Sequence, residues 1–230
     1  DSLKIASGQL TEKPFLDYVS KTSKPIFLST GMSKMTDVLS AIETIRRNSD
    51  NKITVFQCTT NYPSKISEAN INVIDSFKKI PNIEVGYSDH VTNNYACFAA
   101  VAKGVSAIEK HFTLNKMLNG PDHSCSLDPK GLKDLVYGIR QIEKSLGIYI
   151  KEPTESEKEN ILGMKRSLVY KKSLKKGIKL GLEDFAFKRP MIGLIPNDVS
   201  FFIGKKLTLD VVKDELVDFD HVNKNNMLNE

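Results

Sequence analysis

The sequence predicts an α/β domain built from parallel strands, followed by a small and mostly β domain. In the first 150 residues, short apolar or β-branched runs alternate with segments whose apolar residues have helical spacing. The runs recur every 23 to 30 residues, which is the length of a strand–helix unit, and parallel strands need such crossovers. A polar, charged segment then interrupts the pattern, and only short runs separated by glycines and lysines follow it.

Five strands are expected in the first part of the chain. Each run is short, apolar and bounded by polar or turn-forming residues, as buried parallel strands are. The predicted strands cover residues 3–6, 25–29, 53–58, 83–87 and 106–109.

Three helices between or after these strands have clear apolar faces. Thr36 is expected to cap the first, another begins near Asn93, and Gly147 ends the third. The apolar faces consist of Val38, Leu39, Ile42 and Ile45 in the first helix, Tyr95, Phe98, Ala99 and Ala102 in the second, and Leu132, Leu135, Val136, Ile139, Ile142 and Leu146 in the third.

These patterns divide the chain into four parts. Residues 1–147 form the α/β domain, and the polar residues 148–163 form a linker that contains Pro153. Residues 164–226 form the small β domain, and residues 227–230 form a tail.

The composition excludes several classes of protein. The chain has 230 residues, of which 40% are hydrophobic and 27% charged, so it can form a core. Its net charge of +5 comes from scattered lysines, which favours a solvated surface over a nucleic-acid-binding face. No apolar stretch reaches the length of a membrane helix, and no signal-peptide pattern opens the chain. Three widely spaced cysteines, Cys58, Cys97 and Cys125, favour a reducing compartment and a cytoplasmic protein.

Residues with reactive side chains follow the predicted strands. In a parallel α/β array, the carboxyl ends of the strands meet at one edge, where active sites form. The residues at these ends include Lys4 and Ser7, then Ser29, then Thr60 and Tyr62, then Ser88 and His90, and finally Glu109 and His111.

His90 and His111 are two of only four histidines in the chain. They follow neighbouring strands, so both rings can converge on the same edge of the sheet. Neutral imidazole is a common ligand of borderline divalent metals, and two histidines leave positions for substrate and water. One interpretation is therefore a metal site formed by His90 and His111. The other is one surface histidine and one core histidine without a metal.

Lys4, Ser7, Ser29 and Ser88 form a second group of strand-end residues. An ammonium supplies charge, and hydroxyls and loop amides donate hydrogen bonds, so the group suits a phosphate. Each serine alone could instead shape a turn, because Ser-Gly and Ser-Thr-Gly are common turn sequences. Their shared position at the strand ends favours phosphate binding.

A loop with the sequence Gly120-Pro121-Asp122-His123 follows the fifth strand. Asp122 could contact sugar hydroxyls, exchange a proton or orient a metal ligand. A plain turn is the alternative interpretation.

An ordered set of motifs resembles the sialic acid synthases, that is, N-acetylneuraminate synthase and its legionaminate and pseudaminate relatives. The motifs of the first domain are KIASG at 4–8, STGM at 29–32, CTTNYP at 58–63, GYSDH at 86–90, IEKHFTL at 108–114, GPDH at 120–123 and SLDP at 126–129. In the second domain, RSL at 166–168 and KRP at 188–190 are similar to that family's antifreeze-like (SAF) domain.

The resemblance implies a TIM barrel followed by an antifreeze-like domain. About five of the barrel's eight strand–helix units are present, so residues 1–147 would be its C-terminal portion. Five strands alone leave an open edge and an incomplete core. We therefore expect this chain to be a segment of a longer protein and to be inactive by itself.

The resemblance also implies a transferase reaction in which phosphoenolpyruvate condenses with an N-acylated amino sugar such as N-acetylmannosamine. His90 and His111 would bind Mn²⁺ or Mg²⁺ and act with Asp122 in catalysis. The GPDH loop is more similar to the neuraminate and legionaminate branches than to the pseudaminate branch.

The family's substrate contacts carry over by motif. Lys4, Ser7, Ser29, Thr60 and Ser88 would hold phosphoenolpyruvate, with Thr60 at a position often occupied by Asn in relatives.

The sugar contacts carry over in the same way. Tyr62 and Asp122 would contact the sugar, and Arg189 would reach the N-acyl group in the barrel of a partner subunit. This arrangement implies a domain-swapped homodimer. Two alternatives remain open: another metal-dependent aldolase or phosphosugar enzyme of TIM-barrel type, and a non-catalytic carbohydrate-binding module.

Overall fold

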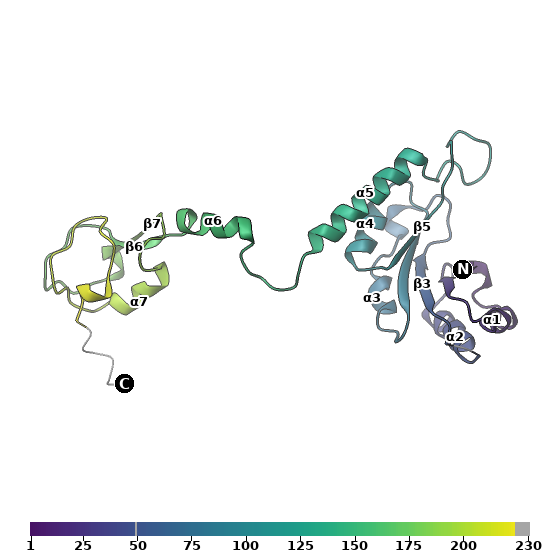
Figure 1. Ribbon diagram of the computed structural model, residues 1–230, viewed down its shortest axis with the longest axis horizontal. Coiled ribbons are helices and arrows are strands. Elements are labelled where there is room, and N and C mark those ends of the chain that lie inside the picture. The colour runs from purple at the N-terminus through teal and green to yellow at the C-terminus, as the bar shows by residue number, and fades with distance from the viewer. Residues whose placement is uncertain (49, 224–230) are drawn as a thin grey trace. The chain divides into compact units, whose positions relative to one another are not determined.

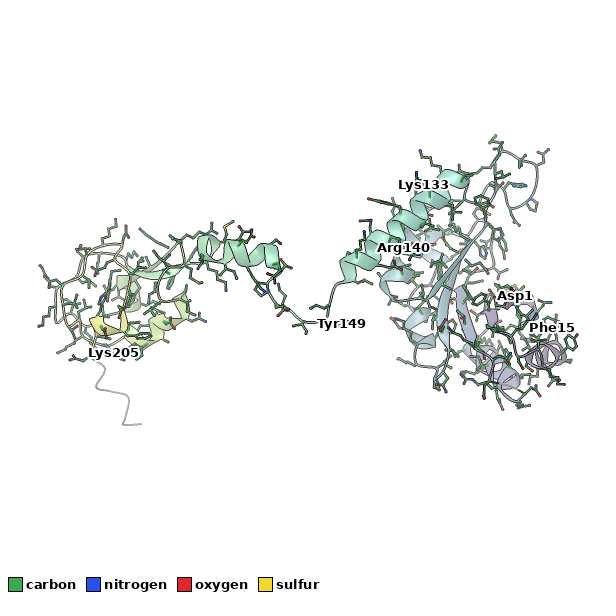
Figure 2. All side chains as sticks on the ribbon, in the orientation of Figure 1. Asp1, Phe15, Lys133, Arg140, Tyr149 and Lys205 are labelled. Atoms are coloured by element: carbon green, nitrogen blue, oxygen red, sulfur yellow. The ribbon has the colours of Figure 1, made fainter. Side chains whose placement is uncertain are left out.

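The computed structural model describes residues 1–48 and 50–223 of the chain. The chain divides into two compact units, Asp1–Ile148 and Tyr149–Glu230 (Figure 1). Tyr149, the first residue of unit 2, is labelled in Figure 2. None of the helices found in the described ranges combines the length and apolar character needed to cross a membrane.

Unit 1 contains a five-stranded parallel sheet, which confirms the predicted α/β class. The strands lie in sequence order, β1-β2-β3-β4-β5, and every neighbouring pair is parallel. Their bounds differ from the predicted ones by no more than two residues. The strands are β1 (Leu3–Ile5), β2 (Ile26–Ser29), β3 (Ile53–Cys58), β4 (Glu84–Asp89) and β5 (Ala107–Lys110).

Helices follow the strands of unit 1, as parallel crossovers require. They are α1 (Lys13–Ser20), α2 (Met35–Arg46), α3 (Val73–Phe77), α4 (Tyr95–Ala102) and α5 (Pro129–Leu146). Figure 2 labels Lys133 and Arg140 along α5.

The ends of two helices test the predicted caps. The cap predicted at Thr36 is wrong, because α2 begins at Met35 and Lys34 is its N-cap. The Asp37 carboxylate accepts a hydrogen bond from the Lys34 backbone N–H at 2.8 Å and so performs the capping. Gly147 ends α5 as predicted, with a φ of 57° that glycine adopts without steric strain.

The core of unit 1 lies between the sheet and its helices. Ile26 and Leu28 of β2 and Ile42 and Ile45 of α2 are among its buried side chains. Because side chains alternate along a strand, the residues between these apolar positions point to the opposite face. The opposite face of the sheet therefore carries the polar strand-end residues.

Close packing also shapes this second face. Phe27 of β2 and Phe56 of β3 meet edge to face, with ring centroids 5.6 Å apart. Gly86 of β4 leaves room for the Phe56 ring, since a Cβ atom at that position would lie 2.6 Å from it. The aromatic pair therefore fills the face of the sheet beneath the polar residues.

Unit 2 is a small β-rich domain, as predicted. It contains α6 (Glu155–Met164), β6 (Ser167–Tyr170), β7 (Phe185–Lys188) and the short helix α7 (Val199–Phe202), and β6 pairs antiparallel with β7. Its core includes Leu168, Tyr170, Phe185 and Phe202.

Helix α6 lies almost entirely within residues 148–163, where the sequence predicts a linker. The Thr154 hydroxyl caps it by accepting from the Glu157 backbone N–H at 3.3 Å. The predicted tail 227–230 and the predicted domain end at residue 226 lie outside the described residues.

Candidate active site

Lys4 lies on the edge strand β1, and its side chain contacts residues of two other strands on the polar face of unit 1. Its Nζ donates to Ser29 Oγ at 2.7 Å and lies 3.5 Å from Glu109 Oε2. On the other side, Ser88 Oγ donates to Glu109 Oε1 at 2.7 Å, because Ser88 and Glu109 are register partners on β4 and β5. The Glu109 carboxylate thus joins Lys4 to Ser88. The structure therefore brings together three predicted phosphate-binding residues, Lys4, Ser29 and Ser88.

Glu109 was not among the candidate site residues, although it lies in a strand-end motif. The signal that identifies it is the alternation of side chains, which puts Glu109 on the same face as Ser88. Its contact with Lys4 could not be predicted, because their strands are at opposite edges of the sheet.

Ser7 and Thr60 form a second small cluster around Gly31. The Gly31 backbone N–H donates to Ser7 Oγ at 3.0 Å, and Ser7 Oγ lies 3.4 Å from the Cys58 sulfur. Thr60 Oγ1 is buried and has no hydrogen-bond partner among the described residues. Because buried polar atoms are nearly always paired, the unpaired Thr60 hydroxyl is an unusual feature of this cluster.

Gly31 itself is required by this geometry. A Cβ atom there would lie 2.0 Å from Thr60 Oγ1 and 2.9 Å from Ser7 Oγ. The absent side chain therefore lets two candidate phosphate-binding hydroxyls approach the same backbone segment.

His90, His111 and Tyr62 bring their rings together, as the strand-end argument predicts for the two histidines. The ring centroids of His90 and His111 are 5.2 Å apart, and those of Tyr62 and His90 are 4.2 Å apart. His90 Nδ1 lies 2.7 Å from the Thr59 carbonyl oxygen, which can only accept, so Nδ1 carries the proton and Nε2 is left free.

Burial lowers the pKa of His90 below its usual value. The hydrogen bond to the Thr59 carbonyl opposes this shift, and the nearby His111 adds to it. His90 is 5% exposed, so it is held as the neutral imidazole that binds metals.

Asp122 comes to His111 from the loop that precedes α5. Its Oδ2 lies 3.7 Å from His111 Nδ1, and the ligand atoms of His111, Asp122 and Cys125 all lie within 4.8 Å of one another. His90 does not belong to this group of three. Imidazole nitrogens with a neighbouring carboxylate fit a divalent metal, so the donor set agrees with the predicted cofactor.

A buried ion pair lies immediately before both histidines. Asp89 Oδ2 and Lys110 Nζ are 2.5 Å apart, with side chains 0% and 4% exposed, and they are register partners on β4 and β5. Asp89 also accepts from the Tyr87 hydroxyl at 3.0 Å and from the Cys97 thiol at 3.1 Å. The pair thus joins the two strands just where His90 and His111 follow.

A cavity of about 480 Å³ adjoins the site between α2, β3 and α3. Its lining includes Thr30, Gln57, Glu68, Cys58 and Thr60. It reaches the candidate site through Cys58 and Thr60, and the Lys4 and His90 side chains do not line it.

Arg189 is the one candidate site residue outside unit 1. It directly follows β7 in unit 2 and is exposed. Its predicted role at a partner's barrel, like the substrate and metal roles of the residues in unit 1, stays a prediction.

Comparisons with known proteins identify both units. Residues 1–151 match the NeuB family, and residues 165–223 match the SAF domain. Over 216 residues, 93% of this chain, it is 41% identical to N,N'-diacetyllegionaminic acid synthase of Campylobacter jejuni. It is 34% identical over 219 residues to human N-acetylneuraminate-9-phosphate synthase. The chain spans 65% of the length of the former and 60% of the latter.

Solved structures agree with this relationship. The spore coat polysaccharide biosynthesis protein SpsE from Bacillus subtilis is 30% identical, with a TM-score of 0.60 over 96% of this chain and 67% of its own. N-acetylneuraminic acid synthetase from Leptospira borgpetersenii is 30% identical, with a TM-score of 0.64 over 70% of this chain and 56% of its own. The five-stranded half-barrel and its small β domain therefore belong to the NeuB family of sialic, legionaminic and pseudaminic acid synthases, with a C-terminal SAF domain.

Proposed function

We propose that the complete gene product, with any residues encoded before Asp1, is a nonulosonic acid synthase. It condenses phosphoenolpyruvate with an N-acylated amino sugar of the N-acetylmannosamine type and releases phosphate. The observation that carries this proposal is the cluster in which Glu109 joins Lys4 to Ser88, beside the paired rings of His90 and His111. A phosphate-binding group and a metal-binding group then lie side by side, as a reaction between these two substrates requires.

Lys4, Ser29 and Ser88 bind the phosphate of phosphoenolpyruvate in this proposal. The lysine supplies charge, and the two hydroxyls, now bonded to Lys4 and Glu109, supply hydrogen bonds. Ser7 and Thr60 extend the site, since Thr60 Oγ1 lacks a partner among the described residues. The same charge favours departure of the phosphate group once the bond to C2 breaks.

His90 Nε2 and the His111 ring hold the divalent metal, Mn²⁺ or Mg²⁺, in this proposal. The bond from His90 Nδ1 to the Thr59 carbonyl fixes the ring and leaves Nε2 as the donor atom. When bound, the metal supplies Lewis acidity toward the carbonyl oxygen of the open-chain sugar.

The reaction itself is balanced without a further reactant. C3 of phosphoenolpyruvate attacks the sugar aldehyde carbon, water adds at C2, and phosphate leaves by cleavage of its C–O bond. Asp122 and Tyr62 face His111 and contact the sugar hydroxyls, and Asp122 exchanges a proton with the substrate. Burial raises the pKa of Tyr62, so its phenol stays a neutral hydrogen-bond donor.

The sugar is proposed to be the precursor of a neuraminic or legionaminic acid. The Gly120-Pro121-Asp122-His123 loop supports this choice, and so does the 41% identity to a relative named for N,N'-diacetyllegionaminic acid. Thr113 Oγ1 and His123 Nδ1 are 2.7 Å apart, so this loop is tied to the segment after β5.

Arg189 is proposed to bind the N-acyl group from a second subunit. A guanidinium is a rigid group of several donors, which suits an acyl carbonyl. This role requires that unit 2 of one subunit reach the barrel of its partner, as in a domain-swapped homodimer. We propose a cytoplasmic location for this enzyme, which follows from its three free cysteines.

The test is a phosphate-release assay on the complete gene product. It is incubated with Mn²⁺, phosphoenolpyruvate and either N-acetylmannosamine or a diacetamido sugar that leads to N,N'-diacetyllegionaminic acid. Release that needs both substrates and stops with EDTA supports the proposal. A reaction on phosphosugars without phosphoenolpyruvate would instead identify another aldolase, and sugar binding without any turnover would identify a binding module.

A further inference from the structure

The loop between β5 and α5 brings a cysteine to one histidine of the proposed metal pair. The ligand atoms of His111, Asp122 and Cys125 lie within 4.8 Å of one another, the only such group of three among residues 1–48 and 50–223. His111 Nδ1 and Asp122 Oδ2 are 3.7 Å apart. Two ligands that each stand about 2.0–2.3 Å from a shared ion are separated by such a distance.

Backbone hydrogen bonds hold Cys125 in place on both sides. The N–H groups of Cys125 and Ser126 donate to the Asp122 carbonyl oxygen at 3.2 and 3.1 Å. The next N–H, that of Leu127, donates to the His111 carbonyl oxygen at 2.8 Å. The three side chains are therefore fixed to one another through a short stretch of backbone.

The surroundings of the sulfur are polar although the residue is buried. Cys125 is 2% exposed, and its thiol donates to the Asp122 carbonyl oxygen at 3.1 Å. A thiol is a weak donor, so little is lost when this hydrogen bond breaks. Buried cysteines often act as small apolar side chains, but this one has a carboxylate and an imidazole beside its sulfur.

We propose that Cys125, which lies beside Asp122, adds its sulfur to the metal that His90 and His111 hold, and that it gives the centre a preference for thiophilic divalent metals such as Zn²⁺ and Co²⁺ over Mg²⁺. On binding, the S–H bond breaks, a metal–sulfur bond forms and the proton passes to water. Thiolate and imidazole suit these metals, whereas Mg²⁺ prefers carboxylate and water oxygens. This inference rests on the metal site of the proposed function and deepens it, and it is tested without substrate.

The experiment is a Co²⁺ titration of the metal-free complete gene product. A cobalt–thiolate bond produces a charge-transfer band in the near ultraviolet, which neither imidazole nor carboxylate ligands produce. The wild-type protein should show this band, and Cys125→Ser should lose it. Loss of a group that merely orients a metal ligand weakens binding about 10- to 100-fold, so loss of the sulfur should weaken Co²⁺ binding at least about tenfold.

Cys97→Ser is the matched control. Cys97 is also buried, and its thiol donates to Asp89 rather than to a member of the metal group. Serine keeps that donor, so the cobalt band and the Co²⁺ affinity should stay as in the wild type. Circular dichroism establishes whether each variant is folded.

A second measurement needs no variant. Zn²⁺ should displace Co²⁺ from the wild-type protein and abolish the band, while Mg²⁺ at the same concentration should not. Co²⁺ binding without the band, a band that survives Cys125→Ser, or a band that Mg²⁺ abolishes as readily as Zn²⁺ would each overturn the inference. Phosphate release without a cobalt–sulfur band would overturn the assignment of Cys125 as a ligand but would leave the proposed function standing. A cobalt–sulfur band without phosphate release would support the ligand assignment and would overturn the proposed function.

Discussion

The side chains of Lys4 and Glu109 lie 3.5 Å apart, although β1 and β5 form the opposite edges of the five-stranded sheet. Neighbouring strands are about 4.8 Å apart, so the edges of a flat sheet of this size would be about 19 Å apart. The sheet is therefore strongly curled, and its curvature brings the first and last strand ends to one place. Ser88 reaches the same carboxylate from β4.

Lys4→Met should therefore act on phosphoenolpyruvate rather than on the sugar. A hydrogen bond to a charged group contributes about 1.5–3 kcal/mol, so kcat/KM for phosphoenolpyruvate should fall about 10- to 150-fold. Lys133→Met, which removes an exposed lysine of α5, is the control and should change neither constant. Steady-state kinetics with each substrate varied in turn measure the effect. An unchanged constant for phosphoenolpyruvate would remove Lys4 from the phosphate site.

Gly31→Ala should weaken the same site by a steric route. The new Cβ would lie 2.0 Å from Thr60 Oγ1, so the loop or the Thr60 side chain must move. We expect a higher KM for phosphoenolpyruvate and an unchanged KM for the sugar. Gly163→Ala in α6 meets no atom within 4 Å and serves as the control. Equal kinetics for the two variants would show that the Ser7–Thr60 cluster does not bind the substrate.

Asp89→Asn should destabilise the fold more than any surface ion-pair change. Removing one partner of a buried pair leaves a buried charge, here Lys110, and typically costs about 3–5 kcal/mol. Asp75→Asn breaks the exposed pair with Lys103 and should have a much smaller effect. Urea denaturation of the complete gene product compares the two. Similar denaturation midpoints would mean that the backbone carbonyls of Val91 and Asn93, to which the Lys110 ammonium already donates, are sufficient partners for its charge.

The strand pattern was predictable because the central strands β2, β3 and β4 are largely buried. Runs such as residues 53–58 are buried at every position, and this produces the continuous apolar signal of a parallel strand. The approach of His90 to His111 was predictable for the same reason, because neighbouring parallel strands end at one edge.

Other features depend on contacts that a local pattern does not contain. Helix α6 has no buried residue, so its sequence lacks the apolar face that identifies a helix, and its polar composition predicted a linker. The partnership of Glu109 and Lys4 needs the curvature of the whole sheet. The position of Cys125 depends on the turn at Asp122, which is held by backbone hydrogen bonds.

Asp184 should make the stability of unit 2 depend on acid pH. Burial would raise its pKa, but the Gly181 N–H and the Lys172 ammonium outweigh burial and hold the pKa below its usual value of 3.8. A carboxyl with a lowered folded pKa adds stability above its unfolded pKa, and this stability is lost as the pH falls through the folded value.

Asp184→Asn should therefore flatten the loss of stability between neutral pH and about pH 3, and Lys172→Met should flatten it in part. Thermal unfolding at several pH values measures the slope. A slope identical to that of the wild type in both variants would show that Asp184 does not contribute.

The domain-swapped arrangement predicts that two inactive variants restore each other. Arg189→Ala removes the proposed acyl contact, and His111→Ala removes a metal ligand. In a mixed dimer, the barrel of the Arg189→Ala chain keeps His111 and receives Arg189 from its partner, so one of the two sites is complete. Random pairing after co-expression makes half of the dimers mixed, and about a quarter of wild-type activity should return. If Arg189 instead serves its own barrel, each site of the mixed dimer lacks one residue, and phosphate release stays at the level of the separate variants. Light scattering then shows whether the protein is a dimer at all.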